Sequence, residues 1–244
     1  MGSGYYAAAT ALISRTQELD TVANNLANVS TAGYRAEKEV FKAVLANAGN
    51  GTDLNRAINN YAVLSDTSFD LSQGAMQKTG NQLDLAIQGP GYFVVKTANG
   101  DVYTRNGSFQ VSARSQLVTS AGDPVLGDDG SPVTMVAGPV TISSDGTISS
   151  QGALAGKLKV VDFPAGTQIE SLGGTYYSAP AAKAKPATTS EVLQGVLESS
   201  NVNPIMAMVQ LVTLQRSEEM MQRALSMFNS EIDKTATQDL PRVG

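Results

Sequence analysis

An apolar 4-3 spacing at both ends of the chain is the feature that most constrains how it folds. Near the N-terminus the spacing is carried by Tyr5, Ala9, Leu12, Thr16, Leu19, Ala23 and Leu26. Near the C-terminus it is carried by Ala207, Leu211, Leu214, Glu218, Met221, Leu225, Phe228 and Ile232. So narrow a stripe is typical of a coiled-coil seam, and a single helix has nothing against which to bury it. We therefore expect the two terminal helices to pair with each other.

The ends of both helices are marked by residues with known end preferences. The first helix is expected over residues 3–28, before a small-residue stretch that closes at Gly33, a residue suited to a positive φ angle. The second is expected to begin with Asn203 as its N-cap and Pro204 at its first helical position. It is expected to extend to about residue 235.

The middle of the chain is predicted to be mainly β. Short apolar segments between residues 83 and 163 alternate with turn signals, and Asn99-Gly100 is a strong hairpin signal. This spacing favours a β sandwich or a partly open barrel. Residues 36–46 are interpreted as helix or loop, and residues 61–80 as extended segments. Residues 175–190, which include two prolines, are interpreted as an extended linker.

The predicted fold class is therefore α+β, with N- and C-terminal helices paired as a coiled coil and a long mainly-β insertion between them. The predicted helical domain combines residues 1–36 with residues 201–244. Residues 37–80 and 187–200 form an extended connecting region, and residues 81–186 form the β domain. We expect the segment within residues 47–52 to be a plain linker.

Composition argues against several classes of function. The formal net charge is -5 and no basic patch is visible, so nucleic acid and anionic membrane surfaces are not expected partners. No apolar run approaches the length of a membrane span, so membrane insertion is not expected. The chain contains no cysteine, histidine or tryptophan, which removes disulfides, thiolate metal sites and the commonest general base. The N-terminal segment does not read as a cleaved signal peptide.

Several motifs have a chemical interpretation and a simpler structural one. Residues 127–130, Gly-Asp-Asp-Gly, carry acids suited to calcium but lack the EF-hand ligand spacing, so a turn is favoured. A glycosidase carboxylate pair among Asp123, Asp128, Asp129 and Asp145 is less favoured than solvated turn acids. Residues 152–157 are one residue short of a phosphate-binding loop. We therefore expect no catalytic, cofactor-binding or metal-binding residues, with a secreted carbohydrate-binding β module as the less favoured alternative function.

Self-association is the chemistry that the sequence favours. Apolar residues outside the seam would stay exposed on a helical hairpin, namely Ile13, Val22, Ile205, Met208, Val209 and Val212. Burying each aliphatic side chain in a neighbouring subunit contributes about 1.5–3 kcal/mol. Contacts between different patches that do not close into a ring build a helical filament.

The predicted assembly interface combines seam residues with an asparagine cluster. The cluster is interpreted either as capping the first helix or as hydrogen bonding to neighbouring subunits. The interface residues are Leu12, Leu19, Ala23, Asn24, Asn25, Leu26, Asn28, Leu211, Leu214, Met221, Leu225 and Phe228.

Four segments resemble signatures of the bacterial flagellar rod and hook protein family. The segment ANNLANVSTAGYRA at residues 23–36 resembles the N-terminal signature. Residues 69–95 and 103–127 resemble two central motifs, and residues 193–216 resemble the C-terminal signature. Within the family, the length and the opening SGYYAAATALISRTQELD are most similar to the proximal rod members, with the distal rod members as the alternative.

The resemblance implies a non-enzymatic subunit of the rod, the drive shaft that crosses the periplasm and transmits torque. It also implies that the terminal helices form an inner tube with the β domain outside. The implied partners are other rod subunits, proximal and distal, and copies of the chain itself. The resemblance further implies export through the flagellar type III apparatus without cleavage of a signal peptide.

Overall fold

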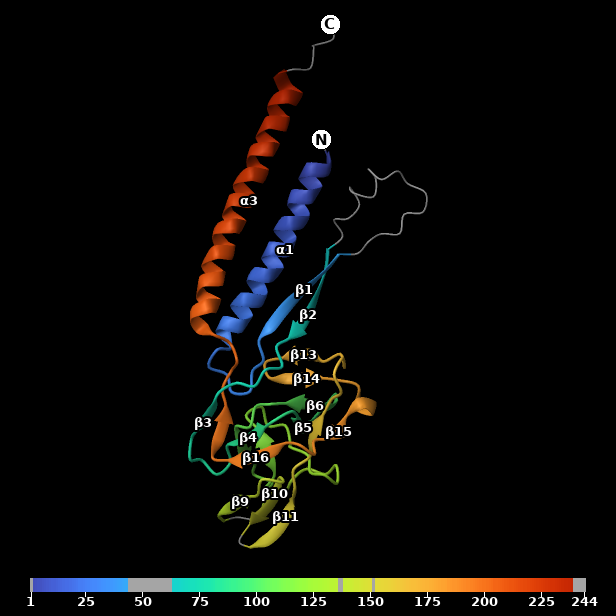
Figure 1. Cartoon of the computed structure of the whole chain (residues 1–244), viewed down its shortest axis with the longest axis vertical. Helices are drawn as coiled ribbons and strands as arrows, with labels where there is room; N and C mark the ends of the chain where they lie inside the picture. Colours follow the sequence, from blue (N-terminus) through green and yellow to red (C-terminus); the bar gives the residue numbers. More distant parts are fainter. Residues whose placement is uncertain (1, 44–62, 136–137, 151, 239–244) are drawn as a thin grey trace. The chain divides into compact units, whose positions relative to one another are not determined.

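The computed structural model describes residues 2–43, 63–135, 138–150 and 152–238 (Figure 1). The predicted linker at residues 47–52 lies outside these ranges.

The chain divides into two compact units that share its length unequally. Unit 1 comprises Met1–Leu26, Glu37–Ser68 and Asn203–Gly244, and unit 2 comprises Ala27–Ala36 and Phe69–Val202. The chain therefore passes between the units four times. The domain boundaries expected from the sequence stay a prediction.

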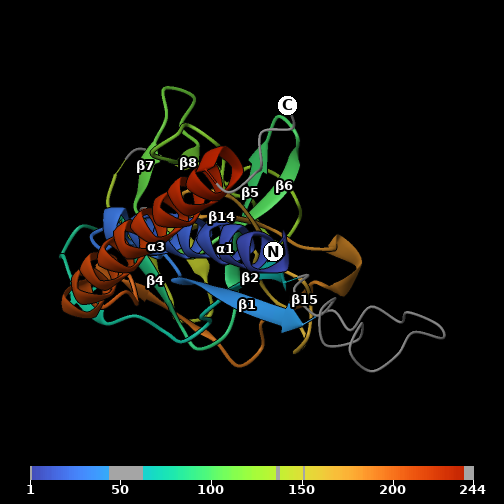
Figure 2. The same cartoon turned by 90° about the horizontal axis from the view of Figure 1, so that it is seen from above.

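Unit 1 is built on two long helices, α1 at Gly2–Ala27 and α3 at Pro204–Gln238. They lie side by side in two perpendicular views, which confirms the predicted pairing of the chain ends (Figures 1 and 2). The Asn203 side-chain oxygen accepts the backbone N–H groups of Ile205 and Met206 at 3.0 and 3.1 Å, as predicted for an N-cap. No helix in the described part of the chain is long and apolar enough to cross a membrane.

Two strands accompany the helices, and they correct one prediction. Strand β1 (Glu37–Ala43) pairs with β2 (Val63–Phe69). The interpretation of residues 36–46 as helix or loop was wrong for residues 37–43, and residues 44–46 lie outside the described ranges. The segment holds a β-branched and an aromatic residue, Val40 and Phe41, and is short for a helix. Its partner is the next strand along the chain, β2.

Unit 2 is mainly β, as predicted. Its strands are β3 (Met76–Lys78), β4 (Leu85–Gln88), β5 (Tyr92–Thr97), β6 (Gly100–Thr104), β7 (Phe109–Val111), β8 (Leu117–Thr119), β9 (Val140–Ile142), β10 (Thr147–Ser150), β11 (Ala153–Lys157), β12 (Val160–Asp162), β13 (Glu170–Gly173), β14 (Tyr176–Ser178), β15 (Lys185–Pro186), β16 (Glu191–Gln194) and β17 (Val196–Glu198). One short 3-10 helix, η1, spans Ala181–Lys183.

The strands form open antiparallel sheets, and within the described residues no sheet closes into a barrel. The largest has six strands in the order β13-β14-β6-β5-β12-β15, and a three-stranded sheet has the order β11-β10-β9. The hairpin predicted at Asn99-Gly100 joins β5 to β6, where Thr97 pairs with Gly100. Strands β14 and β15 fall within the predicted linker at residues 175–190, so that interpretation was wrong for them. Pro186 is tolerated because β15 lies at the sheet edge.

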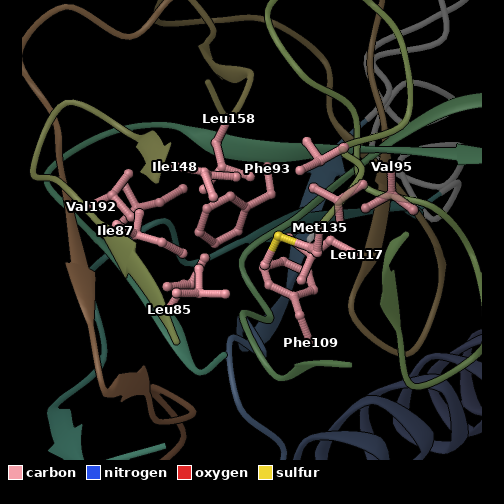
Figure 3. Packing of buried hydrophobic residues seen from close by; sticks show 14 of the residues in the cluster. Leu85, Ile87, Phe93, Val95, Phe109, Leu117, Met135, Ile148, Leu158 and Val192 are labelled. Carbon is pink, nitrogen blue, oxygen red and sulfur yellow. The ribbon is translucent and has the colours of Figure 1, made fainter. Parts of the chain in front are cut away.

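Strand β5 carries core residues on both of its faces. Side chains alternate along a strand, so Phe93 and Val95 join one apolar cluster while Tyr92 and Val94 join another. In the first cluster the Phe93 ring meets the ring of Phe109 edge-on, with centroids 5.2 Å apart (Figure 3). Burial on both faces explains why the strand reads as a continuous apolar run.

Candidate assembly interface and the adjoining junction

The seam of α3 is its most sheltered side. Ala207 and Leu214 are buried, and Leu211, Met221 and Leu225 are half-buried. On α1 the predicted seam residues with described side chains are half-buried, with Thr16 exposed; the half-buried ones are Leu12, Leu19, Ala23 and Leu26. The side chains of Tyr5, Ala9, Phe228 and Ile232 lie outside the described residues.

A second apolar stripe lies on the other side of α3. Ile205, Met208, Val209 and Val212 recur at i, i+3, i+4 and i+7, and their exposed fractions lie between 47 and 72%. At about 100° per residue they lie roughly opposite the seam. We call these four residues the outer stripe. Ile13 of α1 is exposed as well, so five of the six residues expected to stay exposed do so.

Val22 is the exception, because only 9% of it is exposed. It lies three residues after Leu19 and four before Leu26, and so belongs to the same side of α1 as the seam. The buried side of α1 is therefore the wider stripe of an ordinary packed helix rather than a strict coiled-coil seam.

The asparagine cluster makes hydrogen bonds within the chain. The Asn25 side chain donates to the backbone oxygen of Glu37 and accepts the Glu37 N–H, both at 2.8 Å. Asn24 donates to the Glu37 carboxylate at 3.5 Å. Burial raises the pKa of Glu37, and the hydrogen bond from Asn24 opposes that shift. Asn28 accepts the hydroxyl of Thr31 at 3.2 Å, in the turn that follows α1. These contacts join the end of α1 to Glu37 and Thr31, and the role of the cluster, capping or assembly, stays a prediction.

The residues that follow α1 and precede α3 meet in unit 2 at a cluster of buried charges. The cluster, which we call the junction, consists of Arg35, Arg105, Tyr177, Glu198 and Asn201. The Glu198 carboxylate lies 2.7 Å from a guanidinium nitrogen of Arg35 and 3.3 Å from one of Arg105. Both Arg35 and Glu198 are only 1% exposed. One carboxylate thus forms ion pairs with two arginines that come from distant parts of the chain.

Backbone oxygens accept further hydrogen bonds from the two guanidiniums, although the buried Nε atoms of Arg35 and Arg105 have no hydrogen-bond partner among the described residues. Arg35 donates to the Ser72 oxygen, and Arg105 donates to the oxygens of Ile87 and Gly89 at 3.2 and 2.7 Å. The Arg105 guanidinium also lies 5.2 Å from the centre of the Tyr92 ring. Burial lowers the pKa of Arg105, and the Glu198 carboxylate counteracts part of that shift.

Two tyrosines enclose the buried charges. The Tyr177 hydroxyl accepts the backbone N–H of Arg35 at 3.1 Å, and its ring lies 5.9 Å from that of Tyr92. Burial raises the pKa of both phenols above the ordinary value of 10.0. The neutral phenol is therefore the form that this surrounding favours.

The acidic turns have simple structural roles. The Asp129 side chain accepts the N–H of Ser131 at 3.0 Å. The Asp145 side chain accepts the N–H and the hydroxyl of Thr147, and these bonds lower the pKa of Asp145. Carboxylates committed to their own turns in this way match the turn interpretation.

Comparison with known proteins gives the family. Three family models match: "Flagella basal body rod protein" at residues 6–35, "Flagellar hook protein FlgE/F/G D1 domain" at residues 86–150, and "Flagellar basal body rod FlgEFG protein C-terminal" at residues 193–238. The flagellar basal-body rod protein FlgF of Caulobacter vibrioides is 30% identical across 100% of both chains. The chain belongs to the flagellar basal-body rod protein family.

Other rod proteins are similar over nearly the same length. FlgF of Escherichia coli is 33% identical over 93% of this chain and 94% of its own. FlgG of Buchnera aphidicola subsp. Schizaphis graminum is 30% identical over 92% of this chain and 95% of its own. The chain is thus a non-enzymatic structural subunit of the flagellar basal-body rod, FlgF-like, and it assembles with other rod subunits. The three family models match parts of both helices and of the β region between them.

Proposed function

We propose that this rod protein is a subunit of the proximal rod whose outer stripe contacts neighbouring subunits while its seam holds α1 against α3. The observation that carries the proposal is the outer stripe itself. Four apolar side chains at helical spacing are about half exposed or more on a helix whose other side is sheltered. A solvent-facing helix ordinarily carries polar residues there.

The free energy gained by burying the outer stripe favours contacts with several neighbouring subunits over contact with one. Complete burial of four such side chains contributes about 6–12 kcal/mol, and these four are already partly covered, so the gain is roughly half of that. Association costs about 4–15 kcal/mol in lost translational and rotational freedom. One contact through this stripe is therefore marginal, whereas a filament in which each subunit touches several others is stable.

The twelve predicted interface residues have different roles in this proposal. The seam residues Leu211 and Leu214, with their counterparts on α1, shape the surface by pairing the helices. Asn25 and Asn28 set where the chain leaves α1. The neighbours are proposed to be proximal and distal rod subunits and further copies of this chain, which reach the rod by type III export. Family membership and the similarity to FlgF relatives support these assignments.

A charge placed in the outer stripe tests the proposal. The variant Val209→Asp is introduced as the sole copy of the gene in the native strain, with Gln210→Asp, an exposed neighbour on the same helix, as the matched control. We expect Val209→Asp to abolish swimming and to leave rods incomplete in electron micrographs of isolated basal bodies. The control is expected to swim. Equal helix content of the two purified variants by circular dichroism establishes that folding is unaffected, and normal swimming by Val209→Asp would contradict the proposal.

The position along the rod has its own measurement. Cross-linking through a cysteine at residue 212, in a chain that otherwise has none, identifies neighbours in purified basal bodies. Adducts with hook-proximal distal rod subunits alone would move this chain to the distal rod, while adducts with other proximal subunits support the proposal.

A further inference from the structure

Three stretches of backbone that are far apart in sequence are bonded together around the junction. The N–H of Gly33 donates to the backbone oxygen of Glu198 at 2.7 Å. The N–H of Asp70 donates to Ala36, and that of Ser199 donates to Ala75, each at 2.8 Å. All of these residues belong to unit 2. The segments at residues 33–36, 70–75 and 198–201 therefore form one hydrogen-bonded set.

Asn201 repeats this connection with its side chain. Its oxygen accepts the N–H of Ala36 at 2.7 Å, and its nitrogen donates to the oxygens of Asp70 and Ser72 at 2.8 and 3.0 Å. The Asn201 amide thus joins its own segment to the other two, because it offers both a donor and an acceptor.

The Glu198 carboxylate joins the same segments through ion pairs. One of its oxygens forms an ion pair with Arg35 and also accepts the N–H of Gly74 at 2.9 Å, while the other forms an ion pair with Arg105. Removal of this carboxylate leaves two buried guanidiniums without a counter-charge, which is far more unfavourable than the loss of an exposed ion pair.

We propose that the junction is a clamp that holds the chain leaving α1 and the chain entering α3 bound to each other, independently of whether the helices themselves are paired. Ala27 is the last residue of α1, and the chain runs from it to the first clamped segment. After the last clamped segment the chain runs through Val202 to α3. Every contact of the clamp lies within unit 2, so fraying of the helices leaves it intact. The proposal does not depend on which neighbours the rod subunit meets.

Hydrogen–deuterium exchange of the full chain, followed by mass spectrometry, tests the clamp. In the variant Glu198→Gln, which keeps the size of the side chain, we expect amide exchange in residues 31–36, 70–75 and 198–202 to accelerate at least tenfold. Exchange in the β5–β6 hairpin, whose ladder contains no clamp residue, is expected to stay within about twofold. In the unchanged chain, the clamped segments are expected to remain protected at temperatures where α1 and α3 already exchange.

A second variant covers the case in which Glu198→Gln does not fold. Asn201→Ala removes one neutral side chain that joins the three segments, and it is expected to accelerate amide exchange in the same peptides. Asn106→Ala is the matched control, because the Asn106 side-chain oxygen accepts the N–H of Ser108 within a local turn. The proposal is overturned if Asn201→Ala accelerates exchange equally throughout unit 2, if it accelerates none of the clamped segments, or if those segments lose protection together with the helices.

Discussion

At the scale of single residues, the junction depends on glycines as much as on charges. Gly33 has a φ angle of +69°, and a Cβ added there would come within 2.3 Å of the backbone of Arg105. A Cβ on Gly74 would come within 1.9 Å of the backbone oxygen of Ser199. The backbones can approach closely enough to form the clamp only because both positions lack a side chain.

Gly33→Ala is predicted to destabilise the protein by about 1–3 kcal/mol more than Gly80→Ala. Gly80 has a similar φ of +78° but nothing within 4 Å of an added Cβ, so its substitution carries only the left-handed backbone penalty of about 1–2 kcal/mol. Unfolding of the two full-length variants by the denaturant guanidinium chloride measures the difference in stability. Equal midpoints would show that the backbone of Arg105 moves aside without cost.

Tyr177 is predicted to make the protein sensitive to alkali. Burial raises the pKa of Tyr177, so in the unfolded chain the phenol loses its proton near pH 10 while in the folded chain it keeps it. The unfolded state binds fewer protons above about pH 10, and stability therefore falls as the pH rises from there towards the folded pKa.

Comparison with Tyr177→Phe isolates this contribution. The variant lacks the hydrogen bond to Arg35 and is expected to be less stable at about pH 8, yet to lose less stability between about pH 10 and 11.5. Urea unfolding at each pH gives the two slopes. Parallel slopes for the two proteins would refute the role of this phenol, since every other ionisable group is the same in both.

At the scale of elements, the start of α3 is the most sharply defined helix end. Asn203→Ala removes the acceptor for two N–H groups and is predicted to cost about 1 kcal/mol, and to speed amide exchange in the first turn of α3. Gln210→Ala, in the exposed interior of the same helix, is expected to change stability little because alanine favours helix. The hydrogen-exchange rate of the Met206 amide, measured by NMR, reports the local effect of Asn203→Ala. The same rate in the variant and the unchanged protein would argue against the cap.

Elements with strong local signals were predictable from the sequence. The 4-3 spacing indicated both helices, Asn203-Pro204 placed the start of α3, and Asn99-Gly100 placed a hairpin. Strand β1 was missed because its short apolar run fits helix and strand alike. Strand β14 has only three residues, and one of its two partners, β6, lies far away in sequence. Strand pairing supplies most of their stabilisation, and no local pattern records it.

The junction was invisible to sequence reasoning for a related reason. Arg35, Arg105 and Glu198 are single charged residues beside loop-forming segments, where an exposed side chain is the ordinary outcome. The only signal is indirect: Arg105 and Glu198 each come at the end of an apolar strand, where a charge faces burial if another segment covers it. Only the folded structure shows which segment covers each charge.

At the scale of the whole molecule, burial predicts an order of proteolytic cleavage. Arg216 and Arg223 are exposed on α3, whereas Arg35 and Arg105 are buried in the junction. Brief trypsin treatment of the full chain is therefore expected to cut after Arg216 and Arg223 before it cuts after Arg35 and Arg105. Mass spectrometry of the first fragments checks this order, with the urea-denatured chain as the control in which all four sites are cut. An early fragment that begins at Ala36 would contradict it.

The span of the junction along the sequence also has a consequence for when it forms. Ala36 and Asn201 are separated by 165 residues, and Arg35 and Tyr177 by 142. While the chain emerges from the ribosome, Arg35 has neither its phenol nor its carboxylate until nearly all of unit 2 has been synthesised. Contacts of such long range close late and slowly, because the entropy of the intervening loop is lost before they form. The newly made chain therefore passes through an extended period in which its two ends are not yet joined.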